Sequence, residues 1–332
     1  MLVTLCCVVV AAAPGNGADA VVAARVDGES VLRAELDARV RQRTGDPRAA
    51  EAPLGIQAEV IESLVDERLI RAEIKRARIE VGPEEVDKAF EQIRTDLELQ
   101  GVSMEEFLRR GDRTEQDLRE RIKLDIGINR LLAPQLTPAA VEAAFAQRRR
   151  DLDGTLVRAS HIVLRPPSGP GEEAVSQTLV RADRIRREIL RGSLSFAEAA
   201  KRYSSGPSRH RGGDVGGFPR HGAMYEEFAR QAFALAKGEI SRPFVTPSGV
   251  HLVMVTVIQP GTVDLFDIRP QVEQLLSQEL LRGIVLAARQ RVAIEFAPGV
   301  AHFDPTTLAG DPANRRIVVE PGLPASTPKG EK

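Results

Sequence analysis

The chain has 332 residues, of which 42% are hydrophobic, 28% are charged and only 4% are aromatic, and its formal net charge is −1. This length predicts about two domains of roughly 150 residues each, and the composition is ordinary for a globular protein. The near-neutral charge gives no reason to expect nucleic acid or another polyanion as a partner. A chain with no Trp and two Tyr also offers few rings on which bases could stack.

Residues 1–20 have the pattern of a secretory signal peptide. An apolar run, 2–13, is followed by small residues and by ADA at 18–20, an A-x-A cleavage pattern. About 12 apolar residues are too few to span a bilayer, which needs roughly 20. No Lys or Arg precedes the run, so an uncleaved segment that associates with the membrane is the alternative. Cleavage would remove Cys6 and Cys7, and we expect a periplasmic or otherwise extracytoplasmic protein without thiol chemistry.

Residues 21–153 are predicted to form a mainly helical domain. A short strand with a turn at Asp27-Gly28 comes first, and apolar residues then recur at helical spacing in IQAEVIESLVDERLIRAEI. Further helix starts are marked at Ser103 and Thr114, each followed three residues later by an acidic residue. These amphipathic helices fit either an ordinary bundle or an arm whose apolar grooves hold other polypeptide chains.

Residues 154–260 have the pattern of a compact α+β domain. LVRASHIVLR alternates as a strand does, and two helices follow, the second opened by Ser195 and Glu198. A glycine-rich segment, a helical piece and the strand GVHLVMVTVI complete the order β-α-α-loop-α-β. This order predicts a small antiparallel sheet with surrounding helices.

The C-terminal part divides in two. Residues 261–297 are predicted to form one amphipathic helix and a returning strand, VAIEF, that join the N-terminal helices, so that the α+β domain is an insertion. Residues 298–332 are rich in Pro, Gly and small polar residues, and we expect them to be disordered.

The segment GGDVGGF, residues 212–218, raises the question of phosphate binding. A dinucleotide-binding loop needs a strand before its glycines and a helix after them, but here a helix precedes and Phe218-Pro219 follows. The spacing also differs from G-x-G-x-x-G, and no P-loop is present. The segment therefore predicts a tight turn with positive φ, in which Asp214 bonds nearby amides.

Three segments, SHIVL, GGDVGGF and MYEEFARQAFALAKGEISRPFVTPSGVHLVMV, together resemble the parvulin-type peptidyl-prolyl isomerases (the PpiC or rotamase family). The secretory pattern, the helical N-terminal part and the helix after the domain are similar to the SurA/PrsA-like foldases. The resemblance implies a chaperone and isomerase that rotates Xaa-Pro bonds of unfolded or partly folded exported polypeptides, with no cofactor and no metal. Without help, this rotation faces a barrier of about 18–20 kcal/mol.

By the same resemblance, the apolar pocket for the proline ring falls on Val215, Met224 and Phe228, with Phe218 nearby. A pair such as Met224 and Phe228, at i and i+4, also fits plain core packing. The loop RPPSGPGEE contains only Arg165 as a cation, so specificity for phosphorylated substrates is not expected.

The paired histidines of the family fall on His161 and His251, which are expected on adjacent strands, in a hydrogen-bond network with Thr246 and Ser248. The alternative is a pair of ordinary core histidines. A metal site is disfavoured because no i, i+4 pair and no acidic third ligand accompany them.

One position departs from the family. Parvulins carry Cys or Asp where this chain has Gly206, so the domain could be weak, or could only bind peptides as part of a holdase chaperone. A hydrolase is excluded because Ser160 and His161 are neighbours on a strand and point to opposite faces. His302 is expected on the surface.

Overall fold

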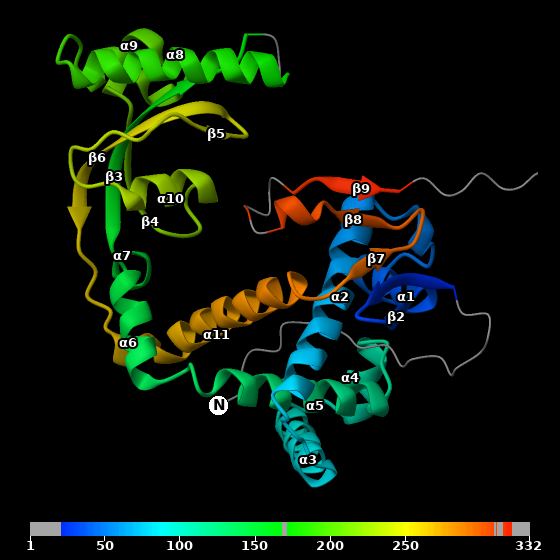
Figure 1. Ribbon diagram of the computed structural model, residues 1–332. Helices are drawn as coiled ribbons and strands as arrows, with labels where there is room; N and C mark the ends of the chain where they lie inside the picture. Colours follow the sequence, from blue (N-terminus) through cyan, green and yellow to red (C-terminus); the bar gives the residue numbers. More distant parts are fainter. Residues whose placement is uncertain (1–20, 168–170, 309, 311–314, 321–332) are drawn as a thin grey trace, which may run out of the picture. The chain divides into compact units, whose positions relative to one another are not determined.

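The computed structural model describes residues 21–167, 171–308, 310 and 315–320 (Figure 1). The expected signal peptide, 1–20, lies outside the described residues. The chain divides into two compact units: unit 1 is the described part of Met1–Thr137 and Gln274–Lys332, and unit 2 is Pro138–Glu273. Within the described ranges, no helix has the length and apolar character needed to cross a membrane.

Unit 1 is mainly helical, as the apolar spacing predicts. Its N-terminal helices are α1 (Arg33–Thr44), α2 (Leu54–Arg76), α3 (Pro83–Leu99), α4 (Met104–Arg110) and α5 (Glu115–Leu132), with a short 3-10 helix at Ala49–Glu51. The side chain of Ser103 accepts from the backbone N–H of Glu106, and Thr114 and Asp117 cap α5 reciprocally. Both predicted helix starts are therefore confirmed.

A three-stranded antiparallel sheet joins the two ends of unit 1. Its strands are β1 (Val22–Val26), β2 (Glu29–Leu32) and β7 (Ile294–Phe296), in the order β2-β1-β7. Asp27 and Gly28 both have positive φ, 51° and 83°, which closes the predicted turn between β1 and β2. The strand expected in VAIEF is β7, and it pairs with β1 from the far end of the sequence.

The expectation of disorder beyond Pro298 is wrong for much of the described segment. Strands β8 (Ala301–Phe303) and β9 (Ile317–Val319) form an antiparallel pair, with a short 3-10 helix at Pro305–Thr307 between them. Ala301 and Phe303 are buried against Ala58 of α2, and the backbone N–H of Phe303 donates to Glu62 Oε1. A few apolar side chains suffice here because α2 already offers a surface on which to bury them.

The expectation that His302 lies on the surface is also wrong. It is only 5% exposed, and its ring stacks on Phe296 with 3.9 Å between centroids and an interplanar angle of 8°. Its Nδ1 lies 3.1 Å from the carbonyl oxygen of Val300. The stack links β8 to β7 inside unit 1.

Unit 2 is the predicted α+β domain with a four-stranded antiparallel sheet. The strands are β3 (Leu156–Leu164), β4 (Asp214–Pro219), β5 (Phe244–Thr246) and β6 (Gly249–Gln259), in the order β4-β3-β6-β5. The helices are α6 (Pro138–Gln147), α7 (Arg149–Leu152), α8 (Glu172–Leu190), α9 (Phe196–Tyr203) and α10 (Glu226–Ala234), with a 3-10 helix at Pro207–Arg211.

The unit boundary lies at 137/138, whereas the sequence analysis placed it at 153/154. Helices α6 and α7 therefore group with the sheet. A physical reason is that Arg150 Nη1 donates to the carbonyl oxygen of Leu235, at the end of α10, over 3.0 Å. Helix α11 (Leu265–Arg289) begins in unit 2 and ends in unit 1, and it is kinked at Ile268 near Pro270 rather than continuous.

Alternation along β3 and β6 divides the core of unit 2 between two faces of the sheet. Val157 and Ala159 of β3 face the core cluster that includes α10, whereas Ile162 and Leu164 face the cluster that includes α8 and α9. Figure 1 shows α8 and α9 on one side of the strands and α10 on the other. His161 has the same parity as Ala159, so it lies on the α10 face.

Candidate active site

His161 and His251 come together because they lie on adjacent antiparallel strands and point to the same face. In the register of β3 and β6, His161 is opposite Val253 and His251 is opposite Val163. The two histidines are thus diagonal neighbours, with 5.4 Å between ring centroids and an interplanar angle of 41°. The structure therefore places the pair as the strand pattern led us to expect.

A hydrogen-bond network surrounds only one of the two histidines. Thr246 Oγ1 lies 2.9 Å and Ser248 Oγ lies 3.0 Å from His251 Nε2, and the two hydroxyls lie 2.9 Å from each other. No hydrogen bond joins His161 to this group in the described part of the chain, and Nδ1 of both histidines has no partner there. The expected network of four residues therefore has only three members, Thr246, Ser248 and His251, among the described residues. His161 contacts it through the ring of His251.

Burial keeps the histidine pair neutral. His251 is 3% exposed, and burial together with the nearby His161 lowers its pKa to about 4. Burial also lowers the pKa of His161, which is only partly buried. Both imidazoles are therefore uncharged at neutral pH, and each can donate one hydrogen bond and accept another.

Aromatic rings enclose the histidines from the α10 side. Phe228 of α10 meets both imidazoles edge-on, at 5.7 Å from His161 and 5.6 Å from His251, and Phe218 lies 5.8 Å from Phe228. The ring of Phe244 stacks on His251 at 5.6 Å and 21°. Sequence reasoning did not single out Phe244, although its place just before Thr246 put it beside the motif.

An apolar surface adjoins this cluster. Val215 and Met224 are partly exposed and pack against the core that contains Phe218 and Phe228, which are 2% and 4% exposed. The partly exposed pair can therefore contact a bound chain, whereas the two phenylalanines support that surface from below.

Gly206 lies directly against the histidine pair. Its φ and ψ, −79° and 156°, are ordinary for any residue, so the backbone does not require glycine. A Cβ at this position would lie 3.0 Å from His161 Nε2 and 2.9 Å from Val163 Cγ1. His161 and Val163 therefore leave little room for a side chain at this position. Ser204, which sequence reasoning missed, accepts from the backbone N–H groups of Val163 and Gly206.

Only Gly212 and Gly213 form the predicted tight turn, whereas residues 214–218, which were also expected in the turn, belong to strand β4 and pair with β3. Gly212, Gly213 and Gly216 have φ of 67°, 86° and 80°, and a Cβ on Gly213 would lie 2.4 Å from the carbonyl oxygen of His161. Asp214 accepts from the backbone N–H of Gly216 and pairs with Arg158, which lowers the pKa of Asp214 to about 2. The glycines let this strand approach β3 closely beside the histidine pair.

Comparison with known families agrees with this geometry. Residues 161–257 match the family described as the PPIC-type PPIASE domain. This segment is a PpiC-type peptidyl-prolyl isomerase domain. Residues 1–132 match the family described as the SurA-like N-terminal domain, so the resemblance found in the sequence is confirmed for both parts of the chain.

The chain is also similar to named chaperones and foldases. It is 27% identical over 250 residues to the Chaperone SurA of Xanthomonas axonopodis, covering 70% of this chain and 52% of that protein. It is 26% identical over 241 residues to the Foldase protein PrsA of Bacillus subtilis, covering 73% and 70%. The PrsA isomerase structure from Bacillus anthracis has 21% identity and a TM-score of 0.37, covering 70% and 96%. The chain thus spans about half the length of the SurA proteins that it matches.

In the described ranges, no three or more His, Cys, Asp or Glu side chains are arranged to hold a metal ion.

Proposed function

We propose that this protein is an extracytoplasmic foldase that rotates Xaa-Pro bonds of unfolded or partly folded exported polypeptides and also acts on them as a chaperone. The observation that carries the proposal is the neutral pair His161 and His251 beside the apolar surface of Val215 and Met224. The secretory pattern of residues 1–20 supports the location. The names of the SurA and PrsA relatives support the chaperone role.

The chemistry of the site follows from the loss of amide resonance during rotation. A planar amide carries partial charges on oxygen and nitrogen, and these charges decrease as the bond twists. An apolar, water-poor surface that holds the proline ring against Met224 and Val215 therefore favours the twisted state. Only interactions that are stronger in that state increase the rate. Each decrease of about 1.4 kcal/mol in the barrier makes the rotation ten times faster.

Within this proposal, the two histidines have different roles. His251 is buried and held by Thr246 and Ser248, so it fixes the position of the pair. His161 is partly exposed, and we assign it the contact with the substrate amide. With glycine at position 206, no carboxylate or thiol assists, so we expect slower rotation than in a domain with an acid there.

Exchange between cis and trans Ala-Pro in a short unphosphorylated peptide tests the proposal. We would measure it by NMR with residues 21–332, and with the variants Met224→Ala and His161→Ala. Met254→Ala is the matched control, because Met254 packs against the opposite face of the sheet. Acceleration that persists in the control but falls in the other two variants is the expected result. Equal rates with and without protein would refute the proposal.

A further inference from the structure

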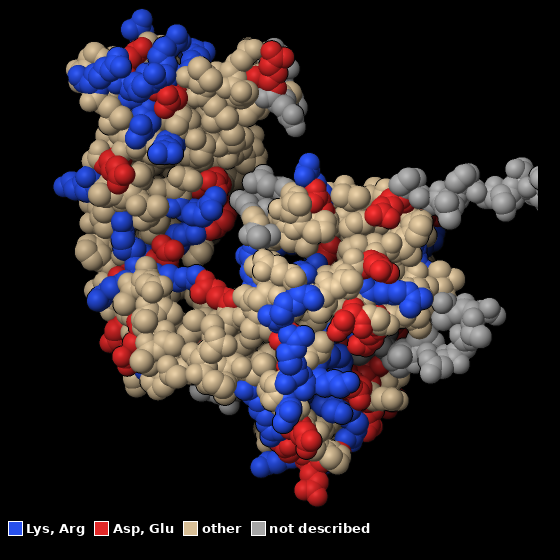
Figure 2. Space-filling model, viewed as in Figure 1, with Lys and Arg blue, Asp and Glu red and all other residues tan. Residues whose placement is uncertain are grey.

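Unit 2 contains a second recess, apart from the histidine pair, that is lined mainly by arginines. Its volume is about 380 Å³, and its charged lining residues are Arg148, Arg149, Arg150, Asp151, Arg220 and Arg230. The apolar part of the lining includes Phe233 and Ala234 at the end of α10. In Figure 2, blue side chains gather over α7 beside a smaller red group. Five arginines against one aspartate give the lining a positive charge.

Two hydrogen-bond donors of Arg150 have no acceptor among the described residues. Its Nη1 donates to the carbonyl oxygen of Leu235 at 3.0 Å, but its Nε and Nη2 are buried and have no partner among the described residues. Buried donors are nearly always paired with protein, water or ligand. Nε and Nη2 are the two parallel donors with which a guanidinium holds both oxygens of a carboxylate. Arg150 lines the recess, so a turn of its side chain that exposes Nε and Nη2 would present a donor pair suited to an oxyanion.

Other arginines of the recess already have acidic partners. Arg220, whose side chain is 10% exposed, pairs with Glu226 and Asp151, and Arg230 pairs with Glu227. Arg149 is 67% exposed and has only a 3.7 Å contact with Asp153. Positive charge that could attract an anion thus remains at Arg149 and Arg150, which are adjacent in the sequence.

The recess lies close to the apolar surface of Val215 and Met224, because helix α10 contributes to both. Phe228, behind the proline surface, and Ala234, in the recess, are both on α10, six residues apart, which is about 9 Å along the helix. An extended chain advances about 3.3 Å per residue, so about three residues span this distance. The recess is also far larger than one water molecule, which takes up about 30 Å³.

We propose that this recess binds the carboxylate side chain of an acidic residue that lies about three residues from the proline of a client polypeptide. The inference rests on the proposed function, since it assigns a second contact to the same client. The carboxylate would accept from Nε and Nη2 of Arg150, with Arg149 at the entrance. The domain would thereby prefer acidic sequences around the proline without needing a phosphate.

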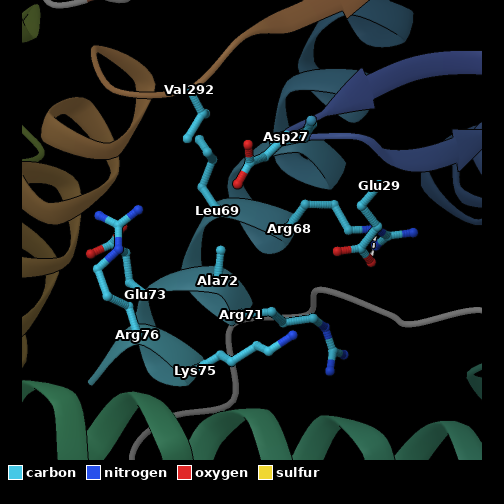
Figure 3. A pocket seen from close by; sticks show the side chains of 11 residues that line it. Asp27, Glu29, Arg68, Leu69, Arg71, Ala72, Glu73, Lys75, Arg76 and Val292 are labelled. Atoms are coloured by element: carbon cyan, nitrogen blue, oxygen red, sulfur yellow. Dashed lines mark ion pairs between the residues drawn. The ribbon is translucent and has the colours of Figure 1, made fainter. Parts of the chain in front are cut away.

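A larger cavity in unit 1 has no comparable excess of positive charge. It has a volume of about 570 Å³ and lies between the turn after β1 and the C-terminal half of α2 (Figure 3). Figure 3 shows Arg68 paired with Glu29 across one wall. Arg76 pairs with Glu73 in the same way. With four cationic and three acidic side chains, the lining is nearly neutral, so this cavity indicates no particular ligand.

The test compares two peptides that differ only in charge. Both contain one Ala-Pro bond, and one carries Glu, the other Gln, at the third position on each side of the proline. For each peptide we would measure both the cis–trans exchange rate and the binding affinity by NMR. We expect the Glu peptide to bind and react about three- to tenfold better at low salt, the range of a partly exposed to a partly desolvated ion pair. The preference should shrink as salt is added.

Variants of the recess arginines test whether the preference for Glu depends on this recess. Arg150→Gln and Arg149→Gln should each lower the ratio of the Glu-peptide rate to the Gln-peptide rate. Because Arg150 also caps α10 through Leu235, Arg149→Gln gives a result that does not depend on the fold of that helix. Arg187→Gln is the control, since it removes an exposed arginine from α8, away from the recess.

The outcomes separate the two proposals. If both peptides bind and react equally, the inference is wrong and the proposed function stands. If neither reacts but the Glu peptide binds better through Arg149 and Arg150, the proposed function is wrong and the recess is confirmed. Inorganic phosphate is the third probe: phosphate binding that Arg150→Gln abolishes, without a preference for Glu, would make this a small-anion site and overturn the inference.

Discussion

Substitution of Gly206 by alanine would place a methyl group against the histidine pair. The backbone at this position suits any residue, so the effect comes from packing alone. The new Cβ would lie 3.0 Å from His161 Nε2 and 2.9 Å from Val163 Cγ1, both closer than ordinary contact. Since Val163 is buried in the strand, we expect the imidazole of His161 to move.

The expected size of the effect is the difference between two terms. Overpacking a buried site costs about 1–3 kcal/mol, and replacing glycine by alanine gains about 0.4–1 kcal/mol by restricting the unfolded chain. The free energy of unfolding should therefore decrease by about 1–2 kcal/mol, which lowers the melting temperature by a few degrees. Displacement of His161 should also reduce the isomerase rate.

Calorimetry and the Ala-Pro exchange assay would measure both effects on the same sample. Gly217→Ala is the control, because a Cβ at Gly217 would meet no atom within 4 Å. We expect this control to melt and react like the unmodified protein. A Gly206→Ala variant that keeps both the melting temperature and the rate would show that His161 does not need the space left by glycine.

Three further predictions concern the histidine pair and the C-terminal strands. The pKa of His251 falls from its ordinary 6.5 to about 4 on folding, so the unfolded chain binds the proton first. Stability should then decrease by about 3 kcal/mol as the pH falls from 6.5 to 4. An equal pH dependence in His251→Gln, measured by urea unfolding, would contradict this. Thr246→Val removes a hydrogen bond to His251, and we expect a loss of about 1 kcal/mol and a slower exchange rate, neither of which Thr262→Val, at an exposed position, should cause. Phe303→Ala should lower the free energy of unfolding by about 3 kcal/mol. Ile317→Ala, at an exposed position of β9, is the control. If urea unfolds both variants alike, β8 adds no stability.

The site could be read from the sequence because it depends mainly on two strands and one turn. Alternation along β3 and β6 decides which face His161 and His251 share, and the glycines of the turn before β4 show where that strand comes close. The stacking of Phe244 on His251 could not be predicted in this way, because it depends on how β5 turns back onto β6. The tilt that leaves His161 outside the hydrogen-bond network is likewise a matter of side-chain angle, which periodicity does not report.

The C-terminal segment shows where composition misleads. Its Pro and Gly content resembles that of disordered chains, and Ala301 and Phe303 are too few to form a core alone. They are buried because α2, more than 200 residues earlier, exposes a surface that needs covering, and because Glu62 accepts from the backbone N–H of Phe303. A pattern confined to one segment cannot reveal a partner that far away in the sequence.

Unit 2 has a neutral site, at the histidine pair, and a cationic one, at the arginine-lined recess, and we propose different roles for them. Burial keeps His161 and His251 neutral, and Gly206 supplies no carboxylate, so the proline surface itself has no charge with which to distinguish clients. Such a surface should accept any residue before proline that fits. Selection by charge must then come from a neighbouring site, and Nε and Nη2 of Arg150, once exposed, would be a donor pair at a suitable distance along α10. A neutral site for rotation and a cationic site for selection can therefore vary independently, since Arg149 and Arg150 touch neither histidine.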